Sequence, residues 1–293
     1  MHIPVLQKEV LEILDPKANE NFIDCTVGGA GHAKGILEKN KPNGKVLGID
    51  NDNQQIENSE KYLSDFKERA LLVNDSYANL KEIIDKNNFH PVSGILLDLG
   101  MSSWHLENSK RGFSFLKDEP LDMRYDDKSY LTAQEIVNSQ SRQEIENILK
   151  EYGEERFAEK IAKIIIEARK RTIIKTSGQL AEIIKKAVPL KYQRGRIHCA
   201  TKTFQALRIA VNDELNNLKK VLSQAVEIAE SKGRIAIISF HSLEDRLVKN
   251  FFREEAKKGA IQILTKKPII ASFEEIKLNP RSRSAKLRAA IKK

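Results

Sequence analysis

The 293-residue sequence has little cysteine and no long apolar run. Cys25 and Cys199 are its only cysteines, too few for a disulfide framework or a thiolate cluster, and no metal site is expected. No stretch approaches the roughly 20 apolar residues of a membrane span. Residues 1–4 lack the charged and apolar regions of a signal peptide. These absences predict a cytoplasmic protein without a membrane partner, in which Cys25 is a buried thiol.

Acidic side chains are outnumbered, with 41 Asp and Glu against 50 Lys and Arg, and the formal net charge is +9. The positive charge gathers in residues 156–220 and in residues 277–293, which hold seven Lys or Arg and no acid. Such a distribution favours a polyanionic partner such as a nucleic acid. Solvated basic faces would give the same composition, so charge alone leaves both interpretations open.

Short apolar runs alternate with helical periodicity in the first hundred residues. Because the runs are apolar throughout rather than alternating, they predict a parallel sheet that is covered on both faces. The expected strands are residues 22–23, 45–50, 70–75 and 94–99, and the expected helices are residues 6–14, 33–39, 52–66 and 77–87.

This alternation stops after residue 99 and resumes at residue 234. Residues 100–127 are polar and irregular, and helix signals follow them, including capping boxes that begin at Thr132, Ser141 and Thr176. The pattern predicts one α/β domain, residues 1–103 and 213–293, interrupted by an all-helical insertion, residues 104–212. The remaining expected helices are residues 154–169, 199–210, 213–230 and 243–256, and Gly233 is expected to be the C-cap of the third of these. The remaining expected strands are residues 234–240, 261–265 and 285–291.

A glycine-rich turn, residues 24–32, joins the first strand to the next helix. Glycines at such a junction let backbone N–H groups and a helix N-terminus meet a ligand. Counted from Gly28, a dinucleotide fingerprint needs glycine where this chain has Ala30 and Ala33. A ligand with a small zwitterionic head, such as an amino acid, fits the turn better than a diphosphate. A tight turn without a ligand is the alternative.

Polar residues close the other strands, at the edge where an open parallel sheet binds ligands. Asp50 ends the second strand, where it can bond ribose hydroxyls or cap the next helix. Tyr77 follows the third strand, where its ring can stack near a base or join the core. An acid, a zwitterion-sized turn and a neighbouring aromatic together indicate an S-adenosylmethionine site. A nicotinamide site would use the same acid but needs the missing glycines.

Three further side chains are candidates because exposed polar residues at strand ends are often functional. Asp98 closes a strand so apolar that an acid there is more often functional than a turn residue. His32 lies in the glycine turn and His241 follows the strand at 234–240; each has a structural alternative. Ser242 is interpreted as an N-cap, with Asp245 completing its capping box.

Eight motifs, in order along nearly the whole chain, carry a family resemblance. They are residues 26–32, 97–103, 111–115, 120–124, 152–158, 203–209, 239–246 and 279–284. Together they resemble the MraW (RsmH) family of bacterial 16S ribosomal RNA cytosine-N4 methyltransferases. Eight spaced motifs are specific, whereas any one of them is weak.

The resemblance implies a class I (Rossmann-like) methyltransferase fold with an inserted helical substrate domain, and 16S ribosomal RNA in the small subunit as the partner. The chain has Tyr77 where the family has Phe, and Trp104-His105 where it often has Pro-Gln. The oligomeric state is left open between monomer and homodimer. The expected S-adenosylmethionine contacts are Gly28 from the turn, together with Ala30, Gly31, His32, Asp50, Tyr77, Asp98 and His105.

The implied reaction moves a methyl group from a sulfonium to the exocyclic amine of a cytidine in the decoding region. That amine is a poor nucleophile, so the enzyme must align the reacting atoms and accept hydrogen bonds from the amine. Asp98 is the first candidate acceptor, followed by Ser102, Ser103 and His241. Competing classes are an NAD-dependent oxidoreductase, a non-catalytic RNA-binding module and a DNA amine methyltransferase. DNA amine methyltransferases usually have a Pro-Pro-aromatic run after the fourth strand, where this chain has Leu99-Gly100-Met101.

Overall fold

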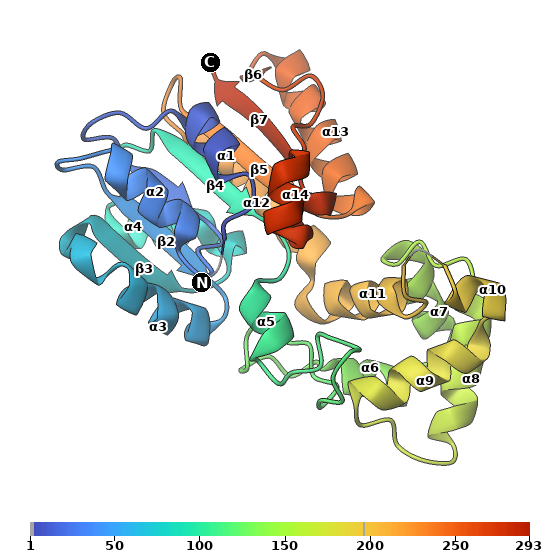
Figure 1. The fold of residues 1–293 in the computed structure, drawn as a ribbon. Helices are drawn as coiled ribbons and strands as arrows, with labels where there is room; N and C mark the ends of the chain where they lie inside the picture. Colours follow the sequence, from blue (N-terminus) through green and yellow to red (C-terminus); the bar gives the residue numbers. More distant parts are fainter. Residues whose placement is uncertain (1–2, 196) are drawn as a thin grey trace. The chain divides into compact units, whose positions relative to one another are not determined.

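The computed structural model describes residues 3–195 and 197–293, and the chain forms two compact units (Figure 1). The first unit comprises Met1–Gly100 and Leu215–Lys293, and the second comprises Met101–Glu214. The boundaries expected from the sequence, after residues 103 and 212, lie close to these. Each unit is described by itself.

A seven-stranded sheet forms the centre of the first unit, in the order β3-β2-β1-β4-β5-β7-β6. The first five strands are parallel, as expected, and β7 runs antiparallel to both β5 and β6. The order reverses between β1 and β4, so the carboxyl ends of these strands flank the switch point at which such sheets bind ligands. The strands are β1 (Phe22–Asp24), β2 (Val46–Asp50), β3 (Ala70–Asn74), β4 (Gly94–Asp98), β5 (Arg234–Ser239), β6 (Ile261–Ile263) and β7 (Lys286–Lys292).

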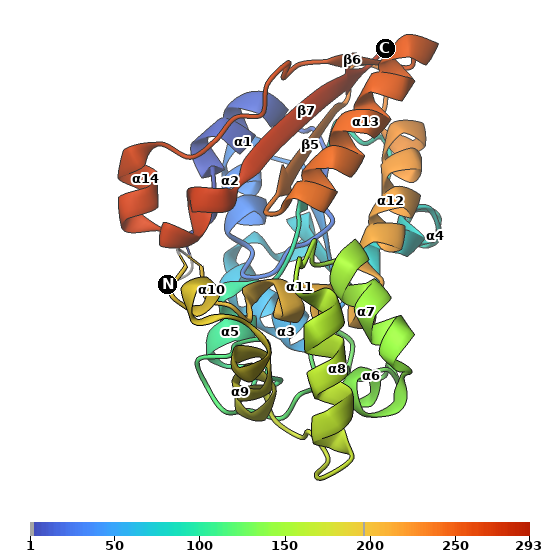
Figure 2. The same ribbon diagram turned by 90° about the vertical axis from the view of Figure 1, so that its right-hand side faces the viewer.

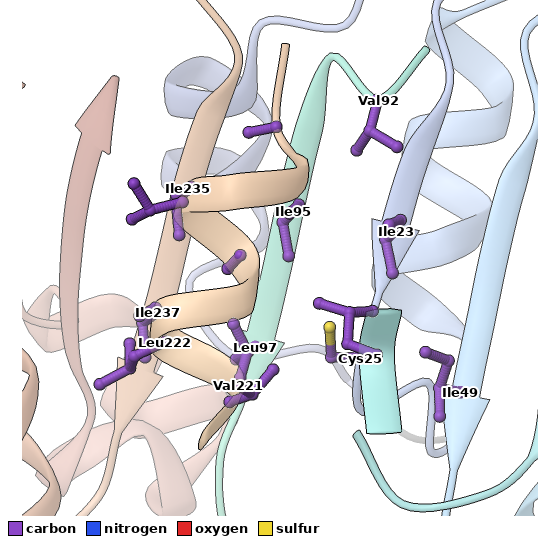
Figure 3. Packing of buried hydrophobic residues seen from close by; sticks show 14 of the residues in the cluster. Ile23, Cys25, Ile49, Val92, Ile95, Leu97, Val221, Leu222, Ile235 and Ile237 are labelled. Carbon is purple, nitrogen blue, oxygen red and sulfur yellow. The ribbon is translucent and has the colours of Figure 1, made fainter. Parts of the chain in front are cut away.

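Successive side chains of a strand point to opposite faces of the sheet, and helices cover both faces. Ile23 and Ile95 join a core with α4 (Leu80–Asn87), α12 (Glu214–Ile228) and α13 (Ser242–Lys258), part of which Figure 3 shows. Figure 2 shows α13 alongside β5 and β7. Phe22 and Leu96 join the opposite core with α1 (Gln7–Leu14), α2 (Gly31–Lys39) and α3 (Asn53–Tyr62). Cys25 lies in the first core and is buried, as expected.

Short helices complete the first unit, and the sequence pattern missed most of them. The helix expected over 52–66 ends at Tyr62, and the chain continues as the 3-10 turn η1 (Ser64–Arg69), within which Lys67 has a φ of 44°. The 3-10 turn η2 (Tyr77–Asn79) precedes α4. Before β7 the chain forms α14 (Phe273–Leu278) and the 3-10 turn η3 (Pro280–Ser284).

The second unit is built from helices around its own apolar core. The capping boxes at Thr132, Ser141 and Thr176 are confirmed, and each begins a helix. Ser103–Glu107 is helical, so the stretch expected to be irregular is not so throughout. The helices are α5 (Ser103–Glu107), α6 (Ala133–Ser139), α7 (Arg142–Glu151), α8 (Ala158–Arg169), α9 (Ser177–Ala187), α10 (Leu190–Gln193) and α11 (Thr201–Asn212).

Two further predicted helix ends are wrong for local backbone reasons. The helix expected from Glu154 begins at Ala158, because Glu154 has a left-handed φ of 46° and the Glu155 side chain accepts a hydrogen bond from the backbone N–H of Phe157 (2.9 Å). Gly233 does not cap α12, which ends at Ile228. Its N–H instead bonds the carbonyl of Glu230 (2.8 Å) in the turn before β5.

Across residues 3–195 and 197–293, no helix combines the length and the hydropathy that a bilayer crossing requires.

Candidate functional site

The glycine turn and Asp50 are bonded to each other at the carboxyl ends of β1 and β2. Asp50 accepts a hydrogen bond from the N–H of Gly28 on Oδ2 (3.0 Å) and one from the N–H of Asp52 on Oδ1 (2.9 Å). Gly28 and Ala30 both have left-handed φ angles, 47° and 59°. Asp50 does not cap α3, because Asp52 does so by accepting from the N–H of Gln54 (3.0 Å). The carboxylate of Asp50 therefore stabilises the conformation of the glycine turn by a hydrogen bond.

Two buried ionisable side chains, His32 and Asp24, and a partly buried one, Asp98, lie beside this turn. His32, in the first turn of α2, places Nε2 3.7 Å from Oδ2 of Asp98, which ends β4. Burial of the imidazole lowers its pKa, but the carboxylates of Asp98, Asp24 and Glu275 together, with Asp98 the strongest, raise the pKa of His32 overall. Burial also raises the pKa of Asp24, at the end of β1, to about 6, against the opposing charge of His32. Asp24 therefore changes its protonation state around pH 6.

Polar atoms in this group lack hydrogen-bond partners among the described residues. They are both ring nitrogens of His32 and Oδ1 of Asp98. Buried polar atoms in proteins are nearly always bonded, so each exception needs a reason. The Asp98 backbone itself is fixed, because its N–H donates to Oγ1 of Thr26 (2.7 Å). A well-anchored carboxylate with an unpartnered oxygen fits a polar ligand at the end of β4.

Tyr77 follows β3 by three residues and begins η2. Its ring is half-buried and packs against the core beneath α4 and α12. Part of the ring thus serves the core. Stacking on a base stays a prediction for the part that is exposed.

A model of the MraW methylase family matches residues 1–293, the full length of the chain. The chain belongs to the MraW methylase family. The resemblance carried by the eight motifs is thereby confirmed. The strand order β3-β2-β1-β4-β5-β7-β6, with β7 antiparallel, is the order of class I methyltransferases and agrees with membership of a methylase family.

Curated relatives of this methylase align over almost their whole length. "Ribosomal RNA small subunit methyltransferase H" of Persephonella marina is 48% identical and is aligned over 99% of this chain and 98% of its own. The proteins of the same name from Clostridioides difficile (42% identical, 99% and 98% covered) and Syntrophotalea carbinolica (45%, 98% and 96%) are also similar.

In the methylase, the turn after β5 forms a capping box one residue earlier than predicted. His241, not Ser242, is the N-cap of α13, and its Nδ1 accepts from the N–H of Glu244 (3.4 Å). Glu244, not Asp245, completes the box by accepting from the N–H of His241 (3.4 Å). The cap falls there because His241 still has extended backbone, with a φ of −137°. Asp245 pairs instead with Nε of Arg288 (2.7 Å).

This cap also bears on the predicted catalytic role of His241. Its Nε2 lies 3.1 Å from Oε1 of Glu244, so both ring nitrogens contact the same residue of α13. The geometry gives His241 a structural task at the end of β5. Its participation in catalysis stays a prediction.

Ser102, Ser103 and His105 of the methylase belong to the second unit. Ser102 is the N-cap of α5, and its N–H (3.1 Å) and Oγ (2.9 Å) both contact Nδ1 of His105. The buried His105 ring lies edge-on to Phe113 and Tyr125, with ring centroids 5.2 and 5.0 Å apart. The His105 ring is therefore firmly held within its own unit. Roles for these three residues toward cofactor or substrate stay predictions.

Sequence reasoning missed the supporting parts of Asp24 and Thr26. Both lie in the turn that the pattern singled out. Thr26 accepts from the N–H of Asp98 in β4, which follows much later in the chain, and the raised pKa of Asp24 comes from its burial in the fold. Glu275, which also acts electrostatically on His32, carried no sequence signal at all.

Proposed function

We propose that this methylase transfers the methyl group of S-adenosylmethionine to the N4 amine of one cytidine in the decoding region of 16S ribosomal RNA. The observation that carries the proposal is full-length similarity, at 42–48% identity, to relatives named ribosomal RNA small subunit methyltransferase H. The N4 target comes from the motif resemblance and from the fit of Asp98 to an amine.

The residues at the carboxyl ends of β1 to β4 fit S-adenosylmethionine. The turn from Gly28 through Ala30 and Gly31 to His32 would hold the amino-acid part, since it offers backbone N–H groups at the start of α2. Asp50 would bond the ribose hydroxyls and the exposed part of Tyr77 would face the adenine. His105 is a further predicted cofactor contact. The bound cofactor would supply an electrophilic methyl group on a sulfonium.

Asp98 is the residue that we expect to meet the target amine. Its unpartnered Oδ1 can accept a hydrogen bond from the amine, whose N–H groups become more acidic as nitrogen gains positive character. Nε2 of His32 lies 3.7 Å from the other carboxylate oxygen, Oδ2, and leaves Oδ1 for the amine. A fixed acceptor also orients the nitrogen lone pair toward the methyl carbon. Ser102, Ser103 and His241 are the further candidates for contacts to the substrate.

Ribosomal RNA suits the remaining features of the chain. A cytosine must leave its stack to reach a cofactor, which costs a few kcal/mol and is least costly in unpaired RNA. The second unit, with the basic stretch that it contains, is the part that we propose to hold the RNA. Phosphate contacts from Lys and Arg would supply most of the affinity.

The test is mass-spectrometric mapping of 16S ribosomal RNA from cells with and without the gene. We expect one cytidine of the decoding region to lose its N4-methyl group in the deletion and to regain it on complementation. Purified protein should transfer label from S-adenosylmethionine to small subunits of the deletion strain. Transfer to DNA amines instead, or RNA binding without transfer, would contradict the proposal, as would binding of a nicotinamide cofactor in place of S-adenosylmethionine.

A further inference from the structure

Residues 3–7, here called the N-terminal segment, lie directly on the start of α2. A Cβ at Gly31 would be 2.2 Å from Cγ of Pro4, so the proline occupies the space that any other residue at position 31 would need. Nε2 of Gln7 donates to the carbonyl of Gly31 (3.2 Å). Val5 and Leu6 are buried in the same core as Ala30. The last residues of the glycine turn are thus packed against the N-terminal segment.

The N-terminal segment is in turn bound by the far end of the chain. Oε1 of Glu275, in α14, accepts the backbone N–H of Leu6 (2.7 Å), and Nδ2 of Asn279 donates to the carbonyl of Ile3 (3.0 Å). Leu6 is fully buried with a φ of 53° and a ψ of 34°. A leucine keeps this left-handed conformation only where its surroundings hold it. The Glu275 carboxylate thus binds the backbone N–H of the residue that has this conformation.

Glu275 also acts on the candidate site through its charge. The groups that set the pKa of His32 are its burial, which lowers it, and the carboxylates of Asp98, Asp24 and Glu275, which raise it. Asp98 is the strongest of the three, and Glu275 reaches the imidazole from a separate element, α14. Glu275 therefore acts on the glycine turn in two ways. It bonds the N-terminal segment, which packs on Gly31, and its charge raises the pKa of His32.

We propose that Glu275 is a positioning residue for the cofactor site: by holding the N-terminal segment against Gly31, it keeps the glycine turn in the conformation that binds the cofactor. Glu275 touches neither cofactor nor substrate in this proposal. It rests on the proposed S-adenosylmethionine site, whose residues it organises from outside.

The experiment compares Glu275→Ala, Glu275→Gln and Glu274→Gln in the full chain. Calorimetry measures the affinity for S-adenosylhomocysteine, and steady-state methyl transfer gives KM and kcat. Glu275→Ala should raise Kd and KM about tenfold at near-normal kcat, as expected for a lost hydrogen bond to a charged acceptor. Glu275→Gln keeps an oxygen acceptor, so its affinity should stay within about threefold of the parent. Glu274, exposed on the same helix, is the matched control and should change nothing.

The pH dependence of cofactor affinity separates positioning from a merely structural role. Glu275→Gln removes one of the three carboxylates that raise the pKa of His32. Any change in cofactor affinity that is caused by titration of His32 should therefore occur at lower pH in this variant. Should Glu275→Ala fold poorly, Asn279→Asp removes the other link to the N-terminal segment and should raise Kd in the same direction. An unchanged Kd in Glu275→Ala overturns the proposal. So does a lower kcat at constant KM with a lower unfolding midpoint, because that pattern means fewer folded molecules.

Hydrogen exchange on the ligand-free protein keeps the two proposals distinguishable. The amides of residues 28–32 should exchange faster in Glu275→Ala than in Glu274→Gln, whatever the cofactor is. If the parent protein fails to bind S-adenosylhomocysteine but shows this difference, the proposed function fails and the positioning role stands. Equal exchange in both variants would refute the positioning role even if the parent protein binds the nucleoside.

Discussion

Asp98 is the residue on which the proposed chemistry depends most directly. Asp98→Ala removes the acceptor for the amine and leaves the buried imidazole of His32 without its main partner. Methyl transfer should fall by about a hundredfold or more, the usual cost of removing a positioned polar group from a reaction centre. The measurement is label transfer to small subunits at saturating cofactor. Asp65→Ala, at an exposed acid of η1, is the control. Near-normal rate and cofactor affinity in Asp98→Ala would end this role for Asp98.

The raised pKa of Asp24 predicts how the stability of the protein depends on pH. Its pKa is about 6 in the folded protein against an ordinary 3.8, so the folded state binds this proton more tightly than the unfolded state. The free energy of unfolding therefore falls as pH rises from about 4 to 6, by at most about 3 kcal/mol. The raised pKa of His32 acts with the same sign, because the stability that it contributes is lost as pH rises through its folded pKa.

Asp24→Asn removes the Asp24 part of this dependence. The variant should be about 1–3 kcal/mol more stable than the parent at pH 8, with a smaller gain at pH 5, where folded Asp24 is largely protonated. Urea unfolding at the two pH values measures the difference. An equal gain at both would show that the carboxylate is not the titrating group.

Single residues also show where sequence reasoning stops. Asp50 and Asp98 could be predicted because the carboxyl ends of parallel strands share one edge of a sheet, wherever they stand in the chain. The N-cap of α13 could not, because a shift of one residue moves the box from Ser242 to His241, and both carry side chains that can accept the bond. The contact between His32 and Asp98 needs the tertiary fold.

At the scale of elements, the capping boxes predicted at Thr132, Ser141 and Thr176 are confirmed at the residues named. At the start of α7, Oγ of Ser141 accepts from the N–H of Glu144 (3.2 Å), and the Glu144 side chain accepts from the N–H of Ser141 (2.7 Å). Ser141→Ala should lower the free energy of unfolding by about 1 kcal/mol. Ser141→Asp keeps a hydrogen-bond acceptor at the N-cap, so this variant should lose little of the free energy of unfolding. Denaturant unfolding of the full chain measures both variants, and equal losses would show that the hydroxyl does not cap the helix.

Elements without such a signal were missed for a physical reason. The helices α10 and α14 are four and six residues long, too short for apolar periodicity to show. Tertiary contacts stabilise short helices more than propensity does. For α14, the bond from Leu6 to Glu275 spans nearly the whole sequence. What α14 does for the glycine turn was therefore invisible until the two ends of the chain were placed together.

At the scale of the whole molecule, the charge that the sequence shows is not all available to a partner. The stretch 277–293 holds seven Lys or Arg and no acid, yet the fold uses several of them. Lys286 and Arg288 both contact Asp245, and Nζ of Lys292 donates to the carbonyl of Glu227 (2.7 Å). Counting residues in a sequence cannot distinguish these from exposed cations.

The difference between paired and exposed cations gives a test of RNA binding by the whole protein. Each phosphate neutralised by a cation adds about 0.7–0.9 to the slope of log affinity against log salt concentration. Lys277 and Arg283 are exposed, so Lys277→Gln or Arg283→Gln should weaken RNA binding evenly across sequences and lower the slope by about 1 if that cation meets a phosphate. Lys286→Gln removes the same charge from a side chain already facing Asp245 and should leave the slope nearly unchanged.

Fluorescence anisotropy with a decoding-region RNA, at salt concentrations from low to physiological, measures these slopes. A parent slope near zero would exclude phosphate contacts as the source of affinity, and with them the proposed role of the basic stretches. Equal slopes in the parent and all three variants would show that neither Lys277 nor Arg283 contacts a phosphate. A drop in slope for Lys286→Gln alone would mean that RNA displaces the ion pair with Asp245, because only then would that cation be released to a phosphate.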